Sequence, residues 1–278
     1  MQGLSVTPSS VESEKASVDE SATNFMGVNE TDGWAVRRRF GEQLSGRGIE
    51  VGPGHVPFPV STVAEVQFVD RWEPYFNSNL FPELGAEPGF PKPDILVNLD
   101  ETRLEGIASC SQEFVIASHV IEHLANPIAF LVEVHRVLKQ DGNFVLLVPD
   151  RHSTFDRGRP PTPLEHIVKE LEQDVRYVDD QHILDFLNHT SGSLHGRDDQ
   201  SASRVSPEYL ELHRQRSVHV HCWDISEFKL VLDYCDNHLG VKWEFLDFMP
   251  PQAPGTNGDE FGWLLRKRQI TLALGTNT

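Results

Sequence analysis

The chain has 278 residues, which is enough for one large α/β domain or two small ones. Its 42 acidic and 24 basic residues give a net charge of −18, which argues against a nucleic-acid partner because such a partner needs a basic surface. No apolar run approaches the roughly 18 residues of a membrane-spanning helix, and three cysteines are too few for a disulfide framework; we therefore expect a cytoplasmic protein that acts on a small molecule, with no membrane partner.

The first 33 residues differ in composition from the rest of the chain. They hold six acids and one lysine, and they show no clear hydrophobic period. They also lack the basic start and apolar stretch of a secretory signal. Residues 1–33 are therefore predicted to be an acidic flexible tail, and residues 34–278 a single domain that begins with a short helix over 34–44.

Apolar runs bounded by turn residues then alternate with other segments. They predict strands at 48–52, 65–70, 94–99, 114–118 and 143–149. Residues 127–138 have apolar side chains at helical spacing, with Pro127 in the first turn, and Gln140-Asp141-Gly142 is expected to end that helix. The strands are apolar without alternation, which is typical of a parallel sheet covered on both faces.

The pattern changes after the fifth strand. Residues 150–220 are polar and rich in His, Asp, Arg and Pro. Two helices are expected within them, one after Thr162-Pro163 and one near 179–189. We interpret this segment as a His-rich insertion that covers the carboxyl edge of the sheet and acts as a substrate lid, because ligands of α/β proteins bind at that edge.

The C-terminal part predicts one helix and two strands. Asp224 and Glu227 form a variant of the capping box, and the amphipathic helix that they open is expected to end before Gly240. Strands are expected at 241–248 and 261–274, joined without a helix, so they form a hairpin in which one strand is antiparallel. The predicted fold is α/β: a Rossmann-like, mostly parallel seven-stranded sheet with a terminal antiparallel hairpin and helices on both faces.

Two features of residues 48–70 point to a nucleoside-containing cofactor. Gly52-Pro53-Gly54 follows the first strand, and glycines there let a ligand approach the backbone closely. Asp70 ends the second strand, where a carboxylate can accept hydrogen bonds from two ribose hydroxyls. Pro57 and Pro59 interrupt the connection, so almost no room is left for the helix that normally follows such a glycine loop.

The stretch Ala117–Asp150, which reads ASHVIEHLANPIAFLVEVHRVLKQDGNFVLLVPD, resembles the region from strand four to strand five of class I S-adenosylmethionine-dependent methyltransferases, in particular the type 11 group that acts on small molecules. The resemblance implies S-adenosylmethionine as cofactor and S-adenosylhomocysteine as product. It also implies methyl transfer, in small-molecule biosynthesis, to a hydroxyl or amine of a small or sugar-like acceptor. Glu122 and His123 match the Glu-His pair of the family, which we interpret as more structural than catalytic.

Carried over position by position, the resemblance assigns cofactor contacts along the edge of the sheet. The methionine end would lie against Glu50, Gly52 and Gly54, the ribose against Asp70, the adenine amino group against Asp100, and the sulfonium beside Ser118 and His119.

Eleven of the 13 histidines lie between His119 and His221, and they leave several readings open. We choose His152, just after strand five, and His166 as candidate catalytic bases, since a neutral imidazole can take a proton from an acceptor as it is alkylated. For each of these histidines, a structural role as the hydrogen-bond partner of a loop is an equally good interpretation. His219 and His221 could share one face of a strand, near solvent or at a site, but the spacing matches no zinc motif and we expect no metal.

Two other classes of function remain open. In one, the methyltransferase fold serves acid/base or metal-assisted chemistry without methyl transfer, such as a cyclisation. In the other, the chain is a non-catalytic binding module that uses its acidic tail. Asp156 and Arg159 either orient an anionic or hydroxylated substrate or only stiffen a proline-rich loop. The sequence leaves open whether the chain forms a homo-oligomer.

Overall fold

The computed structural model describes residues 34–82, 89–194 and 205–268. The predicted acidic tail and the last residues of the predicted final strand lie outside these ranges. None of the helices in the described ranges is both long enough and apolar enough to cross a membrane.

Seven strands form one mixed sheet in the order β3-β2-β1-β4-β5-β7-β6. The strands β1 to β5 are parallel, whereas β7 is antiparallel to both β5 and β6, so the terminal hairpin is confirmed. Their bounds are β1 Gly46–Val51, β2 Ala64–Asp70, β3 Ile95–Leu96, β4 Gln112–Ser118, β5 Leu138–Pro149, β6 Lys242–Met249 and β7 Glu260–Arg268.

The connection between β1 and β2 contains no helix, as the two prolines predicted, and all of its residues 52–63 are described. Phe58 instead packs into the core beside the helix that precedes β1. Gly48 lies in the middle of the sheet, where a Cβ atom would come within 2.4 Å of the Phe114 carbonyl oxygen. That contact explains why a glycine is needed where β1 passes β4.

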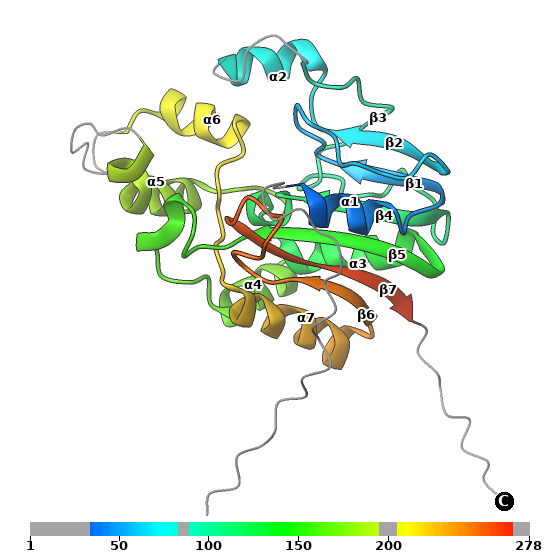
Figure 1. Cartoon of the computed structure of the whole chain (residues 1–278). Helices are drawn as coiled ribbons and strands as arrows, with labels where there is room; N and C mark the ends of the chain where they lie inside the picture. Colours follow the sequence, from blue (N-terminus) through cyan, green and yellow to red (C-terminus); the bar gives the residue numbers. More distant parts are fainter. Residues whose placement is uncertain (1–33, 83–88, 195–204, 269–278) are drawn as a thin grey trace, which may run out of the picture.

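Alternate residues of the central strands enter two separate cores, as strands covered on both faces require. Val115 and Ala117 of β4 pack with α3 (Pro127–Val137), α4 (Leu164–Glu172) and α7 (Ile225–Leu239). The intervening Phe114 and Ile116 face the other core, with α1 (Ala35–Gly41) and Phe58. Helices therefore lie on both faces of the sheet (Figure 1).

In the residues of segment 150–220 that the structure describes, there are three α-helices, α4, α5 (Asp180–Leu194) and α6 (Pro207–Gln215), of which only the first two were predicted, and a short 3-10 helix at Phe155–Gly158. Figure 1 shows α5 and α6 beyond the end of the sheet at which β5 ends, and opposite to the end at which the antiparallel β7 ends. The segment thus lies at the carboxyl edge of the parallel strands.

Several element bounds differ from the predictions for local reasons. The third strand keeps only two residues, and α3 ends at Val137, so Gln140-Asp141-Gly142 does not end the helix. Those residues form an irregular start of β5, where the pairing shifts register opposite Gln112 and Phe114. Asp141 has a φ of 62°, which bends the strand back into pairing. The helices α2 (Pro74–Leu80) and α6 were not predicted, although each begins with a proline.

Candidate functional site

A cavity of about 1160 Å³ lies at the carboxyl ends of the parallel strands. One wall is made by the residues that follow β1, β2, β3 and β4, among them Gly52, Asp70 and His119. The opposite wall comes from the segment 150–220 and includes Phe155 and His219. The volume exceeds the roughly 300–1,000 Å³ of most small-molecule sites, so there is room for two ligands side by side.

Five of the seven residues assigned to the cofactor line this cavity, namely Gly52, Gly54, Asp70, Asp100 and His119. Gly52 and Gly54 both have positive φ angles, 58° and 61°, which favour glycine. A Cβ atom on Gly54 would meet nothing within 4 Å, so the backbone here is open to a ligand. The cofactor contacts themselves stay predictions.

The carboxylates of Asp70 and Asp100 face the cavity from neighbouring strand ends. Asp70 accepts hydrogen bonds from the backbone of Arg71 at 2.6 Å and, more weakly, Trp72 at 3.4 Å. Asp100 accepts one from the backbone of Ala125 at 2.8 Å. Burial nevertheless raises the pKa of both carboxyl groups above the usual range. Further hydrogen-bond donors on a ligand would therefore stabilise their ionised forms.

Glu50 and Ser118, the other two assigned residues, are not among the residues that line the cavity. The Ser118 hydroxyl instead accepts a hydrogen bond from Arg37 at 3.0 Å. Glu50 is buried, and its Oε1 accepts a hydrogen bond from the backbone of Phe58 at 2.8 Å. Its Oε2 has no hydrogen-bond partner. Glu50 thus holds the glycine loop against the proline-rich connection.

The burial of Glu50 predicts how the stability of the fold depends on pH. Desolvation raises the pKa of Glu50 from 4.5 to about 7, against the opposing effects of the Phe58 hydrogen bond and the charge of Arg37. Because the pKa of Glu50 is higher in the folded protein than in the unfolded chain, protonation of this group favours the folded state. Its contribution to the free energy of unfolding is complete below pH 4.5 and is lost as the pH rises through 7. We expect the group to contribute about 3 kcal/mol less at pH 8 than at pH 4.5. Urea unfolding of the ligand-free protein at several pH values should show this loss, and Glu50→Gln should remove it. Parallel pH profiles for the two proteins would contradict the assignment.

His119 and the buried carboxylate of Glu260 form a close pair beside the cavity. The Nε2 atom of His119 lies 2.7 Å from Oε2 of Glu260, whose Oε1 accepts a hydrogen bond from Arg37 at 3.0 Å. Burial would lower the pKa of His119, but the contact with Glu260 outweighs it and raises the pKa. Burial would likewise raise the pKa of Glu260, but His119 and Arg37 lower it. The ring of His119, held by Glu260, lines the cavity, and its φ of 56° sets the turn that aims it there.

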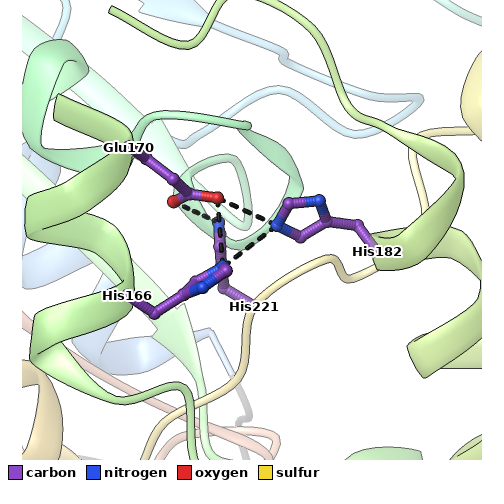
Figure 2. A group of neighbouring side chains, drawn as sticks. All are labelled: His166, Glu170, His182 and His221. Atoms are coloured by element: carbon purple, nitrogen blue, oxygen red, sulfur yellow. Dashed lines mark hydrogen bonds and ion pairs between the residues drawn. The ribbon is translucent and has the colours of Figure 1, made fainter. Parts of the chain in front are cut away.

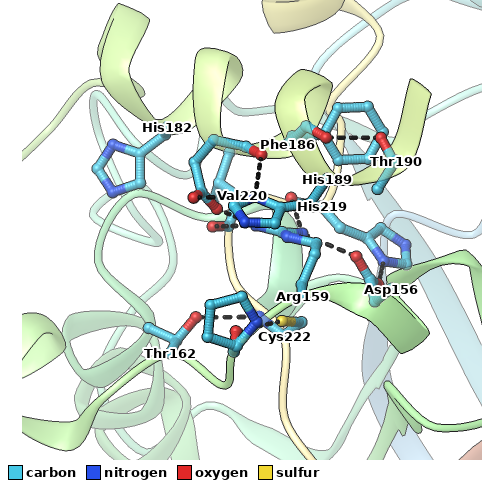
Figure 3. Close-up of polar contacts among 12 residues, drawn as sticks. Asp156, Arg159, Thr162, His182, Phe186, His189, Thr190, His219, Val220 and Cys222 are labelled. Atoms are coloured by element: carbon cyan, nitrogen blue, oxygen red, sulfur yellow. Dashed lines mark hydrogen bonds and ion pairs between the residues drawn. The ribbon is translucent and has the colours of Figure 1, made fainter. Parts of the chain in front are cut away.

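A second histidine is held by a carboxylate on the opposite wall. Nδ1 of His219 lies 2.6 Å from Oδ2 of Asp156, and Oδ1 of Asp156 accepts a hydrogen bond from Arg159 at 2.7 Å (Figure 3). Arg159 also donates to the His219 carbonyl oxygen at 2.7 Å. In the neutral tautomer that donates from Nδ1 to Asp156, the Nε2 atom of His219 keeps its lone pair. Asp156 and Arg159 therefore position His219 at the cavity wall, whether or not they also orient a substrate.

Glu122 lies behind these histidines with its carboxylate 1% exposed and both oxygens without a hydrogen bond. Nε2 of His123 lies 3.4 Å from its Oε1, and Nε2 of His219 lies 3.8 Å from the same atom. Burial lowers the pKa of His123 in spite of the nearby carboxylate. Of the Glu122–His123 pair singled out in the sequence, His123 thus lines the cavity itself, and the Glu122 carboxylate lies behind it and His219.

The two histidines predicted to be catalytic lie elsewhere. His152 is half-exposed, and its Nε2 lies 3.4 Å from Asp224 at the start of α7. His166 lies on α4 in a cluster with Glu170, His182 and His221 (Figure 2). Burial would raise the pKa of Glu170, but the surrounding histidines lower it to about 2. Neither predicted base lines the cavity, so their catalytic role stays a prediction that the geometry does not favour.

Sequence reasoning did not identify Glu260 or Glu170 as parts of any site. Glu260 is the first residue of β7, and only the antiparallel pairing with β5 brings it beside His119. Glu170 follows His166 by one helical turn, and this His-x-x-x-Glu spacing on a helix was the available signal.

Comparison with known proteins supports the resemblance stated from the sequence. Residues 83–146 match the family model described as "Methyltransferase domain". The resemblance to class I methyltransferases is thus confirmed over these residues, which make up less than half of the chain, and the sheet is Rossmann-like. None of the curated proteins is significantly similar to this sequence.

Three solved structures similar to this chain are distant from it in sequence. One from Rhodobacter sphaeroides, named for the Zn-dependent alcohol dehydrogenases, is 13% identical with a TM-score of 0.48, covering 83% of this chain and 87% of that one. A SAM-dependent methyltransferase from Aquifex aeolicus is 12% identical with a TM-score of 0.39, covering 82% and 85%. The trans-methyltransferase CalH in complex with SAH is 14% identical with a TM-score of 0.39, covering 81% of this chain and 52% of that one. The fold assignment therefore rests on the sheet topology and the family match.

Proposed function

We propose that the protein is an enzyme that binds S-adenosylmethionine in this cavity and transfers its methyl group to a hydroxyl or amine of a small-molecule acceptor. The observation that supports the proposal most strongly is the set of chemical groups on the two walls of the cavity. Its sheet-edge wall presents glycine backbone and two carboxylates, and its opposite wall presents a histidine oriented by Asp156.

The residues of the sheet edge fit the parts of S-adenosylmethionine. Asp70 offers a carboxylate whose Oδ2 atom has only a 3.4 Å contact with the Asn77 side chain, which leaves it able to accept from ribose hydroxyls. Asp100 offers an acceptor for the adenine amino group, beside the apolar side chains of Val97 and Leu99. The ring of His119, whose pKa is raised by its contact with Glu260, suits the carboxylate of the methionine end. When bound, the cofactor supplies an activated methyl electrophile, so the protein mainly aligns the acceptor and excludes water.

The wall from segment 150–220 fits the acceptor. Phe155, Phe186 and Tyr209 provide aromatic surface, which binds a carbon skeleton, and His219 provides a proton acceptor. A phosphate-backbone partner does not suit a chain with a net charge of −18. A cytoplasmic location remains our proposal, and it is supported by Cys110, Cys222 and Cys235, none of which forms a disulfide.

Two measurements test the proposal. Isothermal titration calorimetry should show one site for S-adenosylmethionine and for S-adenosylhomocysteine. Incubation with methyl-labelled S-adenosylmethionine and a panel of small hydroxyl and amine compounds should yield a labelled product together with S-adenosylhomocysteine, and tandem mass spectrometry should place the label on oxygen or nitrogen. The absence of binding heat and of any thermal shift with either nucleoside would refute the proposal. Turnover of an acceptor without S-adenosylhomocysteine would favour non-methyl chemistry on the same fold.

A further inference from the structure

Four side chains from three separate segments converge beside the cavity wall, in a cluster that the proposed function does not use. His166 and Glu170 lie one turn apart on α4, His182 lies in the first turn of α5, and His221 comes from the extended segment before α7 (Figure 2). One nitrogen or oxygen atom of each lies within 4.8 Å of the others. Glu170 and His221 are buried, at 5% and 0% exposure.

The distances between these atoms match those around one metal ion. Nε2 of His166 and Nε2 of His182 are 3.1 Å apart, and they lie 3.1 Å and 2.9 Å from Oε1 of Glu170. Nε2 of His221 lies 3.5 Å from the other carboxylate oxygen. Tetrahedral ligands with zinc bonds of about 2.0–2.1 Å are separated by roughly 3.3–3.4 Å. The four groups therefore surround a centre of the right size.

Hydrogen bonds among the four groups do not satisfy them. Neither oxygen of Glu170 and neither ring nitrogen of His221 has a partner in hydrogen-bond geometry, although all four atoms are buried. The two Nε2 atoms of His166 and His182 face each other at 3.1 Å, so at least one of them must be without a proton. Buried polar groups are normally paired, and a group of unpaired acceptors around one point is what a cation would satisfy.

The surroundings of His182 resemble the second shell of a metal site. Its Nδ1 atom lies 2.8 Å from Oδ1 of Asp179, which orients the ring and places the remaining lone pair, on Nε2, toward Glu170. A metal-binding histidine commonly donates its other N–H to a carboxylate in this way.

We propose that His166, Glu170, His182 and His221 bind one divalent transition-metal ion with the properties of zinc. Imidazole nitrogens with a single carboxylate suit zinc better than magnesium or calcium, which prefer oxygen ligands. Four protein ligands leave no open position for a substrate, so the site is structural rather than catalytic.

The position of the ion gives it a role in shaping the cavity. The backbone N–H groups of Val220 and His221 donate to the Glu122 carbonyl oxygen at 2.9 Å and 3.0 Å. The same short segment carries Val218 and His219 to the cavity wall. A metal that joins α4, α5 and His221 would therefore fix this wall, and its binding does not depend on whether the protein transfers methyl groups.

Metal content tests the proposal directly. Protein purified from zinc-supplemented cells should contain about one zinc per chain by mass spectrometry of the metal. In a competition titration, Glu170→Gln and His221→Ala should each lower zinc affinity more than 100-fold, beyond the roughly 10–100-fold expected for the second-shell change Asp179→Asn. His189→Ala, on the same helix as His182 but 2.8 Å from the Asp185 carbonyl oxygen, should bind zinc as the wild type does. His219→Gln should also keep its zinc. That result would show that zinc binds at this cluster and not at the neighbouring group of Glu122, His123 and His219.

Two further readouts do not depend on the stability of the ligand variants. Loading with Co²⁺ should give the visible absorption of a four-coordinate site without a thiolate charge-transfer band. Zinc at a hundredfold excess over its Kd should raise the melting temperature of the metal-free wild type by roughly 5–10 °C, and should shift Asp179→Asn less at the same concentration. Metal-free protein that binds neither ion would overturn the proposal. So would zinc affinity unchanged in folded Asp179→Asn and Glu170→Gln.

Discussion

Replacing Asp70 by asparagine should weaken the binding of S-adenosylmethionine by about 100-fold and leave the fold intact. Each hydrogen bond to a charged group contributes roughly 1.5–3 kcal/mol, and two ribose hydroxyls would donate to this carboxylate, so a loss of about 3 kcal/mol is expected. Asparagine keeps one carbonyl oxygen, which can still accept the 2.6 Å hydrogen bond from the Arg71 backbone. The turn after β2 should therefore survive the substitution.

Asp94→Asn is the matched control for this experiment. The Asp94 carboxylate also accepts a backbone hydrogen bond, from Phe68 at 2.8 Å, but it does not line the cavity. Calorimetry on the two variants should show weaker binding for Asp70→Asn alone, with equal melting temperatures in the absence of ligand. An unchanged Kd for Asp70→Asn would show that the ribose does not bind at Asp70 and that the nucleoside lies elsewhere.

The sheet could be predicted from the sequence because its strands carry local signals. Each central strand is an apolar run bounded by glycine, proline or acidic residues, and burial on both faces makes such runs continuous. The hairpin followed from two final strands joined without a helix, and the helix at Ile225 followed from Asp224 and Glu227, which form both bonds of a capping box. By contrast, the two-residue β3 depends on pairing with Val69 and Asp70 rather than on its own sequence.

The candidate site was only partly predictable, because it combines local and distant features. Gly52, Gly54 and Asp70 end neighbouring strands, so the sheet alone brings them together at one edge. The partners of the histidines are set by tertiary packing. Asp156 and His219 are 63 positions apart, and His119 and Glu260 are 141 apart. Residue types in the segment 150–220 indicated acid/base or metal chemistry, but only the folded structure shows that His219, held by Asp156 and Arg159, faces the cavity.

Replacing His219 by glutamine should lower kcat by about 10²–10⁴-fold, once an acceptor has been identified, while the Kd for S-adenosylmethionine changes little. General-base catalysis by a positioned histidine contributes a rate factor of this size when the acceptor must lose a proton during transfer. Glutamine retains a polar side chain of similar reach but cannot accept the proton. His189→Gln, which alters a histidine outside the cavity, should keep the wild-type rate.

Asp156→Asn tests how His219 is held. Asp156 touches His219 and Arg159 rather than the cavity, so it is a positioning residue. Its replacement should lower kcat and leave KM nearly unchanged, because the asparagine oxygen would stay with the donor Arg159 and the amide N–H would face Nδ1 of His219, which reverses the tautomer of the ring. A full rate for His219→Gln, combined with the loss of binding in Asp70→Asn, would show that transfer proceeds by alignment alone. That outcome is chemically coherent, since the sulfonium is already activated, and it would point to an acceptor that attacks through a lone pair without needing a base.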